Sequence, residues 1–252
     1  MSISTHPREN HLLAALPGND LACLLPFLEL VPLLAGTVLY EPGEPMRYLY
    51  FPTNAIVSLL YSVEDGSSVE IAIVGNDGVV GLAMYMGGET TLSRAVVQSS
   101  GSAYRVKGQV LKSPFDHAGA LQQLLLRYTQ AQLTQMAQRL VCTRAHSLDQ
   151  QFCRWLLQYF DHLPANTLQM TQELIASLLG VRRGGVSEMA GSLQRAGVIS
   201  YRRGCITLLN RPGLEGRSCE CYEVVKDEFE RLFPRALRVP FHSGDYCSSG
   251  NH

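Results

Sequence analysis

Arginine residues gather in one short stretch of this 252-residue chain. Between residues 182 and 211 the only acidic side chain is Glu188. The cationic side chains there are Arg182, Arg183, Arg195, Arg202, Arg203 and Arg211. Guanidinium groups carry forked N–H donors that match phosphate oxygens and the paired O6 and N7 acceptors of guanine. Because the whole chain has a formal net charge of −1, the excess is local, and it predicts contact with nucleic acid.

The elements expected to carry these arginines are two short helices around a tight turn. Thr171 can cap the first helix, Gly180 permits the turn and Gly197 ends the second helix. Apolar residues recur at helical spacing and are expected to be buried: in the first helix Leu174, Ile175, Leu178 and Leu179, and in the second Val186, Met189, Ala190 and Leu193. The residues then left to meet DNA are Arg182, Arg183, Gly185, Ser187 and Glu188.

Residues 198–209 follow with the pattern of a β-hairpin that turns near Arg203 and Gly204. Two helices and a hairpin in this order form a winged helix-turn-helix, and Arg202 and Arg203 near the hairpin turn suit DNA phosphates. An ordinary helical hairpin packed on a core would give the same apolar pattern. The local arginine excess favours DNA binding over that alternative.

These segments resemble the DNA-binding end of Crp/Fnr-type bacterial transcription regulators, on the residues 171–183, 191–199, 211–215 and 219–222. The resemblance extends over nearly the whole chain and implies an α+β fold. Residues 1–116 are expected to form a cyclic-nucleotide-binding-like sensor domain, an antiparallel β-roll or jelly-roll barrel preceded by short helices. A dimerisation helix is expected at 117–146 and a winged helix-turn-helix DNA-binding domain at 147–233. The tail at 234–252 is expected to be disordered. Short apolar runs broken by glycine and proline between residues 36 and 110 independently favour an antiparallel barrel.

The resemblance also implies how DNA is bound. Arg183 corresponds to the family's guanine-reading arginine, and a homodimer would bind an inverted repeat in double-stranded DNA. RNA polymerase is a further expected partner if the protein activates transcription. Gly184 and Glu188 replace a glutamate and an arginine of better-known members, so the operator sequence does not carry over. Glu188 is expected either to accept from a cytosine N4 group or to lie in solvent, and both alternatives stay open.

The expected dimerisation helix is long and rich in apolar residues. We expect its partner-facing seam to include Leu125, Tyr128, Leu133, Met136 and Leu140. The alternative is that the barrel and the winged domain cover both sides of this helix within one chain.

The barrel lacks the residues with which related barrels hold cyclic nucleotides. Where relatives have a Gly-Glu-Leu turn and an arginine followed by serine or threonine, this chain has Gly81-Leu82-Ala83 and Arg94-Ala95. Cyclic AMP is therefore not expected, and any small-molecule effector is unknown. Gly81 and Arg94 are weak candidates for an effector site, and an Arg94 paired with a surface carboxylate is the favoured alternative.

Seven cysteines are scattered along the chain, and we expect free thiols and no cofactor. Cys219 and Cys221, with Cys205 or Cys247, are a possible metal-binding set, although C-x-C lacks the usual two-residue spacing. Haem bound through His117 or His146 is a second open alternative. The N-terminal cysteine cluster of iron–sulfur relatives is missing from the sequence, because the first half holds only Cys23.

Composition bounds the remaining classes. With 46% hydrophobic and 17% charged residues the chain is expected to be folded, and no apolar run reaches the ~18 residues of a membrane span. A cytoplasmic protein with no membrane partner is expected. Motifs of phosphate-binding loops, zinc peptidases and serine hydrolases are lacking, so an enzyme is not expected. The competing hypothesis is an effector-binding or redox-sensing module whose winged domain contacts proteins rather than DNA.

Overall fold

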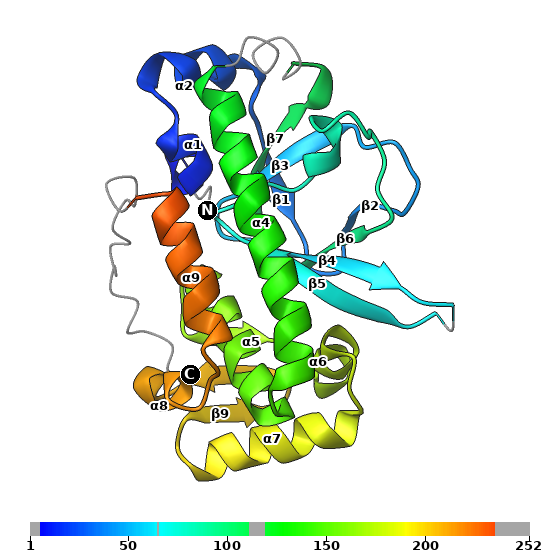
Figure 1. The fold of residues 1–252 in the computed structure, drawn as a ribbon, viewed down its shortest axis with the longest axis vertical. Helices are drawn as coiled ribbons and strands as arrows, with labels where there is room; N and C mark the ends of the chain where they lie inside the picture. Colours follow the sequence, from blue (N-terminus) through cyan, green and yellow to red (C-terminus); the bar gives the residue numbers. More distant parts are fainter. Residues whose placement is uncertain (1–5, 65, 111–118, 235–252) are drawn as a thin grey trace, which may run out of the picture.

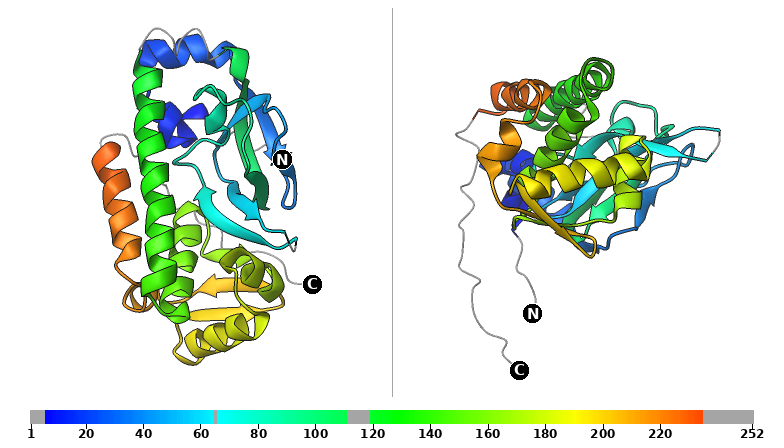
Figure 2. Two further views of the ribbon diagram at one scale, coloured as in Figure 1. Left: turned by 45° about the vertical axis from the view of Figure 1, so that its right-hand side comes forward. Right: turned by 90° about the horizontal axis from the view of Figure 1, so that it is seen from below.

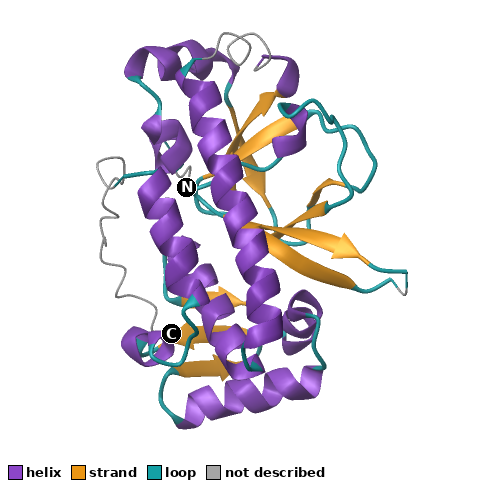
Figure 3. Ribbon diagram, in the orientation of Figure 1, coloured by secondary structure: helices purple, strands orange, loops and turns teal. Residues whose placement is uncertain are grey.

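The computed structural model describes residues 6–64, 66–110 and 119–234 (Figure 1). His117, Cys247 and nearly all of the tail predicted to be disordered lie outside these residues. The barrel is at one end of the molecule, the winged domain is at the other, and one long helix runs between them (Figures 1 and 3). None of the described helices is long and apolar enough to cross a membrane.

The expected antiparallel barrel is confirmed as two facing sheets. One sheet has the order β1-β7-β3 and the other β2-β6-β4-β5. The strands are β1 (Glu29–Leu33), β2 (Val38–Tyr40), β3 (Tyr48–Pro52), β4 (Ile56–Ser62), β5 (Ser68–Val74), β6 (Arg94–Ser99) and β7 (Gly101–Lys107). Small and β-branched side chains such as Ala55, Val57, Val74 and Val97 fill the space between the sheets. The short helices α1 (His11–Ala15) and α2 (Gly18–Leu24) precede the barrel.

The long helix α4 (Ala120–Ala145) is 26 residues long, which corresponds to about 39 Å. One face packs on the barrel, where Leu121, Leu124, Leu125 and Tyr128 join a single apolar cluster. A second face is covered by α9 (Cys221–Leu232), whose Phe229 meets the ring of Tyr128 edge-on. The two helices lie side by side in every view (Figures 1 and 2).

Two of the residues predicted for a dimer seam are thereby corrected. Leu125 and Tyr128 are fully buried in the chain's own core, so they do not face a partner, whereas Met136 is only partly buried against the barrel and stays a candidate. That face of α4 packs against apolar side chains of the barrel. Leu133 and Leu140 do face solvent, with 62% and 68% of their surface exposed, and Leu126 on the same face is 54% exposed.

The winged domain begins at α5 (Leu148–His162), where Ser147 and Gln150 form a reciprocal capping box. Most of α5 is buried beneath the elements that follow. These are β8 (Thr167–Gln169), α6 (Gln172–Leu179), α7 (Arg183–Arg195), β9 (Ile199–Arg202), β10 (Cys205–Leu208) and α8 (Arg211–Glu215). The three strands form a sheet in the order β8-β10-β9.

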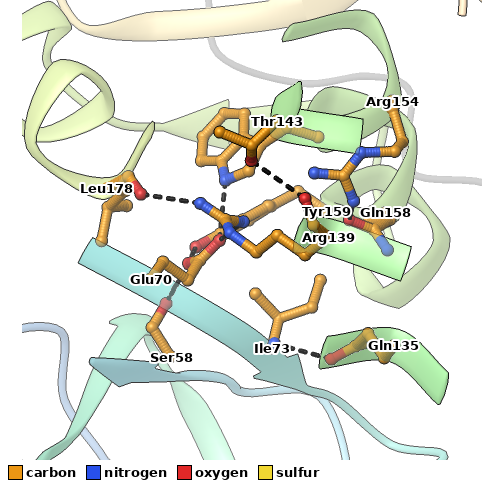
Figure 4. Close-up of polar contacts among 11 residues, drawn as sticks. Ser58, Glu70, Ile73, Gln135, Arg139, Thr143, Arg154, Gln158, Tyr159 and Leu178 are labelled. Carbon is orange, nitrogen blue, oxygen red and sulfur yellow. Dashed lines mark hydrogen bonds and ion pairs between the residues drawn. The ribbon is translucent and has the colours of Figure 1, made fainter. Parts of the chain in front are cut away.

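A buried carboxylate joins the barrel to the winged domain (Figure 4). Glu70 of β5 is 1% exposed and accepts hydrogen bonds from the hydroxyls of Ser58 and Tyr159 and from the indole of Trp155. Arg139 of α4 lies 3.4 Å from this carboxylate and donates to the carbonyl of Leu178 in α6 at 2.9 Å. Side chains of α4 and α5 therefore meet at the Glu70 carboxylate of the barrel, and Arg139 links this site to the backbone at the end of α6.

Candidate nucleic-acid interface

Local sequence signals build the two helices of the motif as predicted. The Thr171 hydroxyl accepts from the backbone N–H of Leu174, and Gly180 ends α6 in the left-handed conformation with φ of 70°. Ile175 and Leu178 are buried, but the prediction that Leu174 is buried is wrong. Leu174 lies in the first turn of an eight-residue helix, on the side away from the core.

The second helix, α7, presents its first turn to solvent. Arg182 is the N-cap, Arg183 is the first helical residue, and both side chains are exposed. The buried face consists of the predicted residues Val186, Met189, Ala190 and Leu193. Gly184 and Gly185 have open space where a Cβ would stand, so neither glycine is required by packing. The positive end of the helix dipole and the two arginines together favour an anionic ligand at this turn.

The predicted hairpin is confirmed and stands beside α7. Arg203 and Gly204 both have positive φ, 49° and 76°, as a two-residue type I′ turn requires. Tyr201 fixes the hairpin: its N–H donates to the Gln194 side chain of α7, and its hydroxyl donates to the Met170 carbonyl before α6. Arg202 and Arg203 are exposed at the tip of this hairpin, which Tyr201 links to α7.

Helix and wing share one shallow hollow of about 260 Å³, which both Arg183 and Arg203 line. Glu173 of α6 also lines it and pairs with Arg183, with 2.7 Å between Nε and Oε1. Both side chains of this pair are well exposed, and such pairs contribute only about 0–1 kcal/mol. A DNA phosphate or base edge could therefore replace Glu173 as the partner of Arg183 at a small cost in free energy.

The other polar residues of the motif differ in their exposure and in their side-chain partners. Glu188 and Ser187 are exposed on α7, and the Ser187 hydroxyl donates to Gln172. Arg211 does not belong to the basic surface, because Asp161 and Glu215 hold its guanidinium. The basic surface therefore lacks Arg211, which the sequence analysis had included, and it holds the acidic Glu173 of α6 beside Arg183.

The weak effector candidates lie apart from this surface, on the barrel. Arg94 pairs with Glu41, with 3.0 Å between Nε and Oε2, as the favoured alternative predicted. Gly81 has φ of 106°, and a Cβ there would meet the Tyr48 carbonyl at 3.1 Å. The glycine is therefore explained by its backbone without any ligand.

The cysteines are not arranged as the sequence suggested. Cys205 lies in the wing strand β10, whereas Cys219 and Cys221 lie beside Cys142 and His146 at the end of α4. The sequence analysis did not bring these four residues together, because α4 and α9 are far apart in sequence.

Comparison with known families agrees with both halves of the fold. Residues 150–217 match the model of the Crp-like helix-turn-helix domain, and residues 30–117 match the model of the cyclic nucleotide-binding domain. A search of curated proteins found no significant match.

Solved structures share the architecture at low sequence identity. FixK2 from Bradyrhizobium japonicum is 19% identical, with a TM-score of 0.66 over 76% of this chain and 98% of FixK2. The CRP-family regulator TTHB099 from Thermus thermophilus is 18% identical, with a TM-score of 0.63 over 75% of this chain and 96% of its own. The c-di-GMP-responsive regulator CLP from Xanthomonas campestris is 15% identical, with a TM-score of 0.59 over 76% and 99%. These likenesses establish the fold.

Proposed function

We propose, from the premise that this chain belongs to the Crp/Fnr family of transcriptional regulators, that it binds an inverted repeat in double-stranded DNA as a homodimer. One observation carries the proposal. The first turn of α7 carries Arg182 and Arg183, and the tip of the wing carries Arg202 and Arg203. All four side chains are exposed, and Arg183 and Arg203 line one hollow.

The roles of the four arginines follow from where they lie. Arg183 stands at the first turn of the helix that would enter the major groove, where a guanidinium can bind guanine O6 and N7 together. Arg202 and Arg203 are held on the wing and Arg182 at the helix start, so we assign them to phosphates. The bare glycines 184 and 185 leave room for the DNA backbone to come close to α7.

The exposed leucines of α4 support the homodimer. Leu126, Leu133 and Leu140 are each seven residues apart, and all three are exposed in the single chain. This is the spacing of one core position in a two-stranded coiled coil, and a partner helix would bury these leucines. Ala137 lies on the same stripe and is also exposed. Two chains paired through this stripe would carry two copies of α7, so the operator should contain two half-sites related by a twofold axis.

Selection of duplex DNA from a random pool tests the proposal directly. Purified protein should enrich an inverted repeat, and the affinity for the enriched sequence should fall steeply as salt is raised. A protein that enriches no sequence, and whose binding to duplex DNA is independent of salt, would not be a regulator of this type.

Arg183→Ala is expected to relax base preference at one position of each half-site. The lost paired contact corresponds to about 1–3 kcal/mol, or about 5- to 150-fold in discrimination. Selection with the variant, compared base by base with the wild type, measures this. Glu173→Ala is the matched control, because it removes the partner of Arg183 and leaves the guanidinium in place. If preference were unchanged in Arg183→Ala, the assigned register of α7 would be wrong.

Arg202→Ala is expected to weaken binding to all sequences alike. Loss of one phosphate contact should reduce the slope of log affinity against log salt by about 1. Fluorescence anisotropy over a salt series, on specific and scrambled duplexes, gives both quantities. The control is Arg8→Ala, an exposed arginine before the barrel. A change confined to the specific duplex would instead assign Arg202 to base recognition.

A further inference from the structure

Three thiols and one imidazole converge where the end of α4 meets the start of α9. Cys142 and His146 are four residues apart and project from the same side of the helical end, and Cys219 and Cys221 flank the turn into α9. Their ligand atoms all lie within 4.8 Å of one another. We propose that Cys142, His146, Cys219 and Cys221 bind one divalent metal ion of the zinc type.

The spacing of the ligand atoms suits a single ion. Four ligands at tetrahedral zinc distances, about 2.3 Å for sulfur and 2.0 Å for nitrogen, are separated from one another by roughly 3.5–3.8 Å. The Sγ atoms of Cys142 and Cys219 are 3.5 Å apart, and so are Cys221 Sγ and His146 Nδ1. The remaining pairs lie within 4.8 Å, so a contraction of at most about 1 Å brings all four atoms to one centre.

The atoms around these ligands are arranged to orient them. Nε2 of His146 lies 3.1 Å from the carboxylate of Glu220, which leaves Nδ1 turned toward Cys221. A carboxylate behind a histidine is the usual support of a metal-bound imidazole. The amide of Gln138 donates to Cys221 Sγ at 3.1 Å, a contact that orients this sulfur within the cluster. Glu220, the residue between the two cysteines, therefore has a role in the same site.

Burial and donor type define the class of ion. All three cysteines are buried, and the side chain of His146 is 11% exposed. Four protein ligands without an open position characterise a structural site rather than a catalytic one. Three thiolates and one imidazole select zinc over magnesium or calcium, which prefer oxygen ligands.

The position of the site indicates what the ion would do. Cys142 and His146 end the long helix immediately before the chain enters α5, while Cys219 and Cys221 follow α8 of the winged domain. One ion would thus hold α9 against α4 at the junction between the dimerisation helix and the winged domain. This site is independent of whether the arginine surface binds DNA.

Metal analysis of the tag-free full-length chain, purified under reducing conditions, tests the site. We expect about one zinc per chain, and we expect Co²⁺ to give the thiolate charge-transfer and tetrahedral ligand-field bands of a sulfur-rich site. Cys221→Ser and His146→Ala should each lose most of the bound metal. Cys205→Ser and Cys23→Ser are matched controls, because these thiols lie outside the cluster, and they should retain one ion.

Two results would overturn the proposal. One is a reduced wild-type chain that holds no zinc and takes up neither Zn²⁺ nor Co²⁺ at equimolar concentration. The other is a native disulfide between Cys142 and Cys219 found by mass spectrometry, since a bonded pair cannot supply thiolates. If the variants fail to fold, the cobalt spectrum of the wild type still decides, because it requires no substitution.

Discussion

Replacing Leu133 and Leu140 with aspartate is expected to convert the proposed dimer into a monomer and to weaken binding to an inverted repeat by about 10²- to 10⁴-fold, the gain that linking two binding modules gives. Both side chains are more than half exposed among the residues that the structure describes, and the proposed partner helix would cover them. Charges at these positions would be buried without partners in the dimer. Light scattering after size exclusion gives the mass, and anisotropy gives the affinity.

The control for this variant is Leu92→Asp, because Leu92 is a strongly exposed leucine on the barrel rather than on α4. It should leave the mass and the affinity unchanged. The monomeric variant should keep the far-ultraviolet spectrum of the wild type, since neither leucine belongs to the core of one chain. A double variant that stayed dimeric would assign the interface to another surface.

Leu125 and Tyr128, which the sequence analysis placed in the dimer seam, would be poor probes of the proposed dimer because both are buried within one chain. Aspartate at Leu125 or Tyr128 would place a charge among the buried side chains that join α4 to the barrel. Loss of DNA binding in such variants would report unfolding. Apolar residues occur on several faces of α4, so helical spacing alone could not separate the face covered by the barrel from the face left open.

The motif at the other end of the chain could be predicted closely from local signals. The cap at Thr171, the left-handed Gly180 and the turn at Arg203 and Gly204 each depend on residues only a few positions away. Such signals survive in a single sequence because the physics is local. The Arg183–Glu173 pair was missed because it depends on how α6 and α7 are turned toward each other.

The thiol cluster shows the opposite case. Cys142 and Cys219 meet across 77 residues of sequence, and α9 was not predicted as a helix that returns along α4. Considered alone, C-x-C lacks the usual metal spacing. The available signal was Cys142 and His146 four residues apart in a predicted helix, which is a recognised ligand spacing on one helical face. Pairing that signal with C-x-C would have given the four ligands.

Glu70→Leu is expected to destabilise the folded chain by roughly 3–5 kcal/mol, the usual cost of leaving one partner of a buried ion pair alone. Burial lowers the pKa of Arg139, and the Glu70 carboxylate opposes this shift by favouring the charged guanidinium. Without Glu70 the side chains of Tyr159 and Trp155 also lose their buried acceptor. Urea unfolding at neutral pH, compared with the wild type, measures the loss.

The double variant Glu70→Leu with Arg139→Leu distinguishes the cost of an unpaired buried charge from the cost of disturbed packing. Removing both charges should recover part of the stability lost in Glu70→Leu, because no unpaired buried charge remains. The exposed pair Arg94 and Glu41 is the matched control, and Arg94→Ala should change stability by only about 0–1 kcal/mol. Since Arg139 also donates to Leu178, we further expect faster amide exchange in α6 of Glu70→Leu than in the wild type. If the two single losses simply added in the double variant, Glu70 and Arg139 would not be coupled, and the contact between barrel and winged domain would depend on apolar packing instead.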